Sequence, residues 1–79
     1  MSENSAFDAE LDASGLNCPL PILRAKKALA SLASGQVLRI TATDPGSRRD
    51  FEVFAKQTGH ELLQVERGEK SWTFYLKRR

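Results

Sequence analysis

The spacing of apolar residues in this chain of 79 residues changes repeatedly between the two-residue period of a strand and the longer period of a helix. Alternating segments, which predict strands, lie at about residues 7–12, 36–44, 61–66 and 71–77. Segments with helical spacing, which predict helices, lie at about 19–33 and 47–58. The order β-α-β-α-β-β is therefore the strongest constraint on the fold.

This order predicts an α/β (α+β) two-layer sandwich. Each strand-helix-strand unit predicts a parallel pair of strands with a right-handed crossover, and the final hairpin adds one antiparallel strand. We therefore expect a four-stranded mixed sheet with two helices on one face, and Trp72, Phe74 and Leu76 on the core side of the last strand. A chain of this length holds a single domain, here residues 7–79, after a flexible polar N-terminus at 1–6.

Turn residues predict where the helices begin and end. Gly35 and Gly59 are placed to end the first and second helix, and Ser47 with Asp50 resembles a weak capping box at the start of the second. The first two strands are expected to be parallel, so the loop before Cys18 and the loop 44–47 should lie at the same edge of the sheet. Both helix N-termini are then expected beside the Cys18 thiol.

Cys18 is the only cysteine, and it stands at the predicted start of a helix between Asn17 and Pro19. Pro19 and Pro21 suit the first helical turn, whose N–H groups have no partner within the helix, and they stiffen it around Cys18 as cap residue. The helix dipole favours a thiolate there, and cysteines so placed have pKa values lowered from about 8.5 to roughly 3.5–7.5. The alternative is a buried cysteine that acts as a small hydrophobe.

A single thiol limits the possible chemistry. It excludes an internal disulfide and a dithiol redox cycle. His60 is predicted at the amino end of the third strand, away from Cys18, so a Cys-His dyad is not expected. One cysteine and one histidine fall short of a structural zinc site, and we expect neither a metal nor a cofactor. The chemistry that remains is group transfer, in which the single thiol accepts a group covalently and passes it on.

Composition narrows the partners and the location. The net charge of +2 is far from the excess that drives phosphate binding, so direct nucleic-acid binding is not expected. The start MSENSAFDAELD lacks the pattern of a signal peptide, and no segment is apolar enough to cross a membrane. With an unpaired thiol, these features predict a cytoplasmic protein with no membrane partner.

Several short motifs occur together in a fixed order. They are Leu11-Asp12, Gly15-Leu16, Cys18-Pro19-x-Pro21, Lys26-Lys27-Ala28-Leu29, Gly35, Asp44-Pro45-Gly46, Arg49-Asp50 and Gly59-His60-Glu61-Leu62. With these motifs the chain resembles the TusA (SirA-like) sulfur-carrier family over about residues 8–79. The chain departs from common family patterns at Asp50-Phe51-Glu52, where relatives often have Asp-Ile-Pro, and at Ala55, where some have a second cysteine.

The resemblance implies the same fold and a function as a sulfurtransferase or sulfur carrier. Cys18 would accept a persulfide sulfur from a cysteine desulfurase or rhodanese-like donor. It would then pass that sulfur to an acceptor protein of a relay, in one branch of the family for 2-thiouridine formation in tRNA. The chain's own residues agree, because a helix N-terminus stabilises a persulfide anion and no second thiol can displace the cargo.

Other charged residues have two interpretations each. Arg24, Lys26 and Lys27 either steer partners toward Cys18 or form the solvated face of a helix. Asp44 is either a turn or cap residue or an acid catalyst, and Arg48 either stabilises a persulfide anion or lies free at the surface.

Two alternative functions stay open. The first is a regulatory or redox-sensing module that uses the same thiol, or one in which Cys-Pro ligates haem. The second, RNA binding through the sheet, requires an exposed aromatic such as Tyr75 on its free face.

Overall fold

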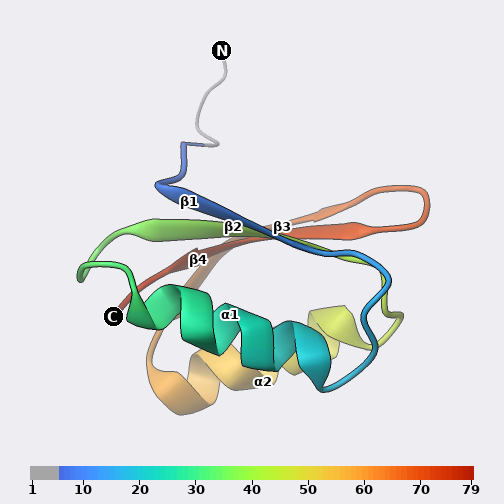
Figure 1. Cartoon of the computed structure of the whole chain (residues 1–79), viewed down its shortest axis with the longest axis horizontal. Helices are drawn as coiled ribbons and strands as arrows, with labels where there is room; N and C mark the ends of the chain where they lie inside the picture. Colours follow the sequence, from blue (N-terminus) through green and yellow to red (C-terminus); the bar gives the residue numbers. More distant parts are fainter. Residues whose placement is uncertain (1–5) are drawn as a thin grey trace.

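The computed structural model describes residues 6–79 and contains four strands and two helices in the predicted order. These elements are β1 (Ala9–Ala13), α1 (Leu20–Ala30), β2 (Val37–Ala42), α2 (Ser47–Thr58), β3 (Glu61–Arg67) and β4 (Trp72–Lys77). Both helices cover one face of a single sheet, so the molecule has two layers (Figure 1). The predicted two-layer sandwich with a mixed sheet is confirmed. The predicted flexible segment 1–6 falls outside the described residues except for Ala6.

The order of strands in the sheet is β1-β2-β4-β3. β1 is parallel to β2, whereas β4 is antiparallel to both of its neighbours, β2 and β3. The prediction that β2 and β3 form a parallel pair is wrong, because β4 folds back along β3 and inserts between them. A β-bulge at Leu63 interrupts the β3–β4 pairing, and the Leu63 side chain is 47% exposed.

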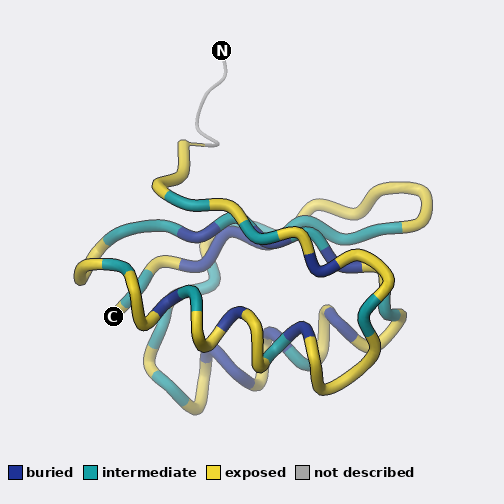
Figure 2. The backbone as a smooth tube through the Cα atoms, in the orientation of Figure 1, coloured by how far each residue is buried: buried dark blue, intermediate teal, exposed yellow. Residues whose placement is uncertain are grey.

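The core lies between the sheet and the helices, where the buried residues of both layers face one another (Figure 2). Its largest fully buried apolar side chains are Phe51, Phe74, Leu29, Leu38, Ile40 and Leu76. Phe51 of α2 lies over Phe74 of β4 with ring centroids 4.6 Å apart, which fixes α2 against the centre of the sheet. Phe74 and Leu76 face the core as predicted, and Trp72 packs against it partly buried.

The ends of α1 differ from the prediction. Pro19 is the N-cap and its carbonyl accepts the Leu23 N–H, so the helix begins at Leu20 and not at residue 19. The N–H groups of Ser31 and Leu32 bond to carbonyls three residues back, which tightens the last turn and ends the helix at Ala30. Gly35 therefore lies in the turn to β2, beyond the helix end.

The ends of α2 follow the sequence more closely. Gly59 adopts φ 84° and caps the helix C-terminus, as predicted. The predicted capping box is absent, because Ser47 is already the first helical residue and no side chain caps the start. Asp44 closes the preceding turn instead, with its carboxylate accepting the Gly46 N–H at 3.1 Å and its carbonyl accepting the Ser47 N–H.

The face of the sheet opposite the helices is partly covered by its own side chains. Arg39 lies over the rings of Phe7 and Tyr75, donates a hydrogen bond to the Tyr75 hydroxyl at 3.1 Å and pairs with Glu10. Tyr75 is only 4% exposed as a result. The exposed Tyr75 that RNA binding through this face requires is not found.

Between residues 6 and 79, neither helix is both long and apolar enough to span a membrane.

Candidate functional site at the start of α1

Cys18 is exposed and lies in the turn that leads into α1. The Leu20 N–H bonds to the Asn17 carbonyl at 2.8 Å, and Pro19 follows Cys18 as the helix cap. Cys18 is therefore one residue outside the cap position that we predicted for it, since the Pro19 carbonyl already accepts the first helical bond. The alternative of a buried, apolar cysteine is wrong, because the thiol reaches solvent.

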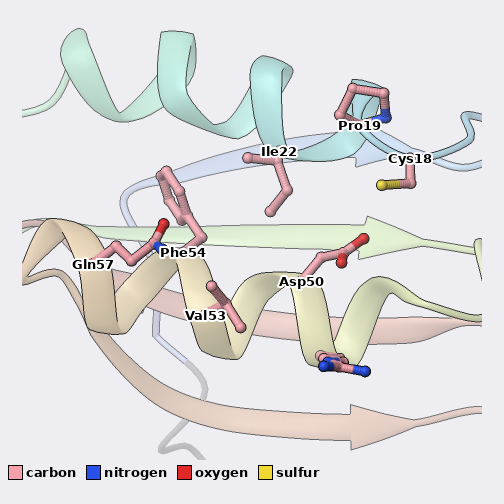
Figure 3. Close-up of a pocket in the computed structure, with 8 residues that line it drawn as sticks. Cys18, Pro19, Ile22, Asp50, Val53, Phe54 and Gln57 are labelled. Atoms are coloured by element: carbon pink, nitrogen blue, oxygen red, sulfur yellow. The ribbon is translucent and has the colours of Figure 1, made fainter.

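The two loops at this edge of the sheet meet, as predicted. The Gly15 N–H in the loop after β1 donates a hydrogen bond to Thr43 Oγ1 in the loop after β2, at 2.8 Å. This bond joins the loop that carries Cys18 to the loop that starts α2. The first turns of both helices consequently face each other beside the thiol (Figure 3).

Between α1 and α2 a cavity of about 270 Å³ opens next to the sulfur (Figure 3). Its lining residues are Cys18, Pro19, Ile22, Arg49, Asp50, Val53, Phe54 and Gln57. Ile22, Val53 and Phe54 give the cavity apolar walls from both helices, Cys18 and Asp50 approach each other at one end, and the Gln57 amide lies toward the other. Pro21 is buried and anchors the first turn of α1, whereas Pro19 lies at the surface beside the cavity.

The pKa of Cys18 shifts in the direction opposite to the prediction. A hydrogen bond with the Asp50 carboxylate raises the pKa of the Cys18 thiol, with smaller contributions in the same direction from desolvation and from the negative charges of Asp50 and Asp44. The predicted fall of the pKa is wrong, because the carboxylate of Asp50, from the neighbouring helix, acts in the opposite direction. Asp50 is the residue beside the thiol that the sequence analysis considered only as part of a capping box, although its place in the first turn of a converging helix was a usable signal.

The predicted basic residues do not gather at the thiol. Arg24 and Lys27 line a separate hollow with Leu11, whereas Lys26 lies in another hollow with His60, Arg78 and Arg79. Arg48 is paired with Glu52 at 3.3 Å. Of the cations on the two helices, only Arg49 lines the cavity beside Cys18.

His60 lies apart from Cys18, as predicted. It precedes β3, its Nδ1 accepts the Arg79 N–H at 3.0 Å, and its ring lies near Phe54. Burial and then the charges of Arg78 and Arg79 lower the pKa of His60. Among residues 6–79, no three His, Cys, Asp or Glu side chains are grouped as a metal would require.

Comparisons with known proteins give a consistent result. Residues 9–78 match the family model described as "Sulfurtransferase TusA". The chain is 61% identical over 72 residues to a "Sulfur carrier protein TusA" of Allochromatium vinosum, covering 91% of this chain and 95% of that protein. It is 52% identical over 67 residues to a putative sulfur carrier protein of Neisseria meningitidis, covering 85% and 90%.

A solved structure agrees with the sequence relatives. The crystal structure of a SirA-like protein from Desulfitobacterium hafniense superposes with a TM-score of 0.77 at 30% identity. The superposition covers 89% of this chain and 96% of that chain.

Proposed function

The chain belongs to the TusA family of sulfur carriers, and from this premise we propose that Cys18 carries the sulfur as a persulfide. One observation supports the assignment above others. The only thiol of the chain is exposed at the head of α1 and opens onto a cavity between two helices, where a partner's reacting group has access.

The proposed reaction consists of two exchanges of one sulfur atom. The Cys18 thiolate attacks the outer sulfur of a donor persulfide, a new S–S bond forms at Cys18 Sγ, and the donor's S–S bond breaks to release the donor thiolate. A cysteine thiolate of the acceptor then attacks the outer sulfur of Cys18-S-SH, and Cys18 leaves as a thiolate. Sulfur changes carriers without a net change of redox state, so no external oxidant or reductant is needed.

The local structure supports this role in two ways. Pro19 and Pro21 stiffen the turn without loss of helical hydrogen bonds, which restricts the backbone next to the sulfur at the edge of the cavity. The absence of a second cysteine from the sequence means that no internal thiol can attack the persulfide and release the cargo.

We assign the protein as a sulfurtransferase that turns over only with a donor and an acceptor protein. The donor is proposed to be a cysteine desulfurase or a rhodanese-like protein, and the acceptor a relay protein of a pathway such as tRNA 2-thiouridine formation. The cytoplasm, with its reducing conditions, is the compartment in which a single free thiol is maintained for such a role.

Intact mass spectrometry tests the proposal. After incubation with a cysteine desulfurase and cysteine, the reduced protein should gain about 32 mass units, one sulfur atom, and lose them again on reduction. The Cys18→Ser variant should gain nothing. If neither a desulfurase nor a rhodanese-type donor loads the wild-type protein, the persulfide assignment is wrong and the regulatory alternative gains support.

A further inference from the structure

Asp50 lies where its carboxylate can act directly on the sulfur. It is in the first turn of α2, half-buried, and points across the cavity toward Cys18 (Figure 3). A Cβ placed on Gly46 would lie 3.7 Å from Asp50 Oδ2 and 3.3 Å from Asp44 Oδ2. Two carboxylates therefore flank the start of α2 at the edge of the sheet that carries Cys18.

No cation of the described chain neutralises Asp50. The ion pairs formed among residues 6–79 are Arg39 with Glu10 and Arg48 with Glu52. Arg49 lines the same cavity but forms no ion pair with Asp50 in this part of the chain. The loop 14–17 before Cys18 contains no ionisable side chain. The Asp50 carboxylate instead approaches the Cys18 sulfur across the cavity that both residues line (Figure 3), and its interaction with the thiol raises the pKa of Cys18.

This arrangement opposes the reactive form of the cysteine. When Cys18 is a thiol, it is neutral and its S–H can donate a hydrogen bond to the Asp50 carboxylate. Once Cys18 loses its proton, two negative charges lie side by side and the hydrogen bond is lost. The same repulsion acts on a persulfide anion at Cys18. The free carrier therefore disfavours both the Cys18 thiolate that attacks a donor and the persulfide anion that forms after loading.

We propose that Asp50 is a positioning residue whose negative charge beside the sulfur directs sulfur exchange toward partners with a positively charged side chain beside their reacting cysteine. The inference rests on the proposed function and assigns the partner chemistry of that same site. A lysine or arginine of the partner that pairs with Asp50 cancels the charge that opposes the thiolate. The proton of Cys18 then passes to solvent, and the exchange proceeds with the bond changes described above.

The pH dependence of alkylation by iodoacetamide, a neutral reagent, provides the first measurement. In Asp50→Asn the thiol should titrate at lower pH than in wild type. Its alkylation at neutral pH should accelerate by about threefold for each unit that the pKa falls, because lower basicity also reduces nucleophilicity. Asp50→Glu should restore the wild-type profile. Glu52→Gln, with the same change of charge on the same helix, is the matched control and should leave the profile unchanged.

The charge preference of thiol–disulfide exchange provides the second measurement. Wild-type protein should react faster with cationic cystamine than with anionic dithiodiglycolate, measured against neutral hydroxyethyl disulfide. Asp50→Asn should reduce the ratio of the cystamine rate to the hydroxyethyl disulfide rate by about fivefold, the effect of one pair of unit charges at about 4 Å in water. In unmodified protein, 1 M salt should also reduce the ratio, since the screening length falls to about 3 Å.

If folded Asp50→Asn retains both the wild-type titration and the wild-type ratio, the proposal is wrong. A wild-type ratio near one, unchanged by salt, overturns it without any variant. These assays use only Cys18 and small reagents, so they are independent of persulfide loading. Wild-type protein that prefers cystamine but takes no sulfur from any donor would therefore refute the proposed function and not the effect of Asp50 on the thiol.

Discussion

The two leucines Leu23 and Leu29 allow the packing of α1 to be tested with one chemical change at two positions of the same helix. Leu29 is 1% exposed and lies in the core, whereas Leu23 is 54% exposed. Truncation of a buried leucine to alanine removes its transfer free energy and leaves a cavity, which together cost about 3–5 kcal/mol. Truncation of the exposed leucine should cost less than about 0.5 kcal/mol.

The cost at Leu29 is large compared with the stability of the whole domain. A chain of 79 residues is expected to have an unfolding free energy of about 4–12 kcal/mol. With a urea dependence of about 1 kcal/mol per M for so small a protein, Leu29→Ala should lower the midpoint of urea unfolding by about 3–5 M. Leu23→Ala should lower it by less than about 0.5 M.

Urea unfolding followed by circular dichroism at 222 nm is the appropriate assay. Equal midpoints for the two variants would refute the assignment of the α1 face that carries Leu29 to the core. A lower midpoint for Leu23→Ala than for Leu29→Ala would show that the helix presents its opposite face to the sheet. Either result would also place Cys18, at the head of the same helix, in a different setting.

Two further measurements test the surroundings of the site. The pKa of His60 is lowered in the folded state, so protonation of His60 favours the unfolded chain. The stability that neutral His60 contributes is present above about pH 6.5, its pKa in the unfolded chain, and is lost as the pH falls from there toward the lower pKa of the folded state. The urea midpoint should therefore drop between pH 7 and pH 5, and drop less in His60→Gln; an equal drop in both would exclude His60 as its source. Thr43→Val removes the acceptor of the Gly15 N–H and should cost about 1 kcal/mol in urea unfolding, whereas Thr43→Ser keeps the hydroxyl and should cost little; identical losses would mean that the bond between the loops contributes nothing.

The succession of strands and helices was predictable because each element has a clear hydrophobic period. Phe51, Phe54 and Ala55 of α2 recur at helical spacing and are all buried, and Leu38 and Ile40 alternate in β2 as expected. Helix ends were less predictable, since they depend on single hydrogen bonds. The Pro19 carbonyl and the tight turn at Ser31 shifted both ends of α1 inward by one to three residues relative to 19–33.

Two properties lay beyond the hydrophobic pattern. The insertion of β4 between β2 and β3 depends on how the hairpin folds back on the sheet, and the period of a strand is the same in the centre of a sheet and at its edge. The charge beside Cys18 depends on Asp50, a residue 32 positions away in the sequence (50 − 18) that approaches only because two loops meet. The position of the thiol was thus predictable from neighbours in sequence, but its protonation was not.

The register of the sheet places the described ends of the chain on the side opposite the thiol. Ala9 pairs with Leu38 and Lys77 pairs with Val37 at one end of the strands, while Ala13 and Trp72 pair with Ala42 at the end that leads into the helices. In Figure 1 the C-terminus and the start of α1 accordingly lie at opposite ends of the molecule. An affinity handle, a surface anchor or a fused protein attached after Arg79 would therefore extend away from Cys18. The carrier could be immobilised by its tail and still receive and release sulfur at its free end.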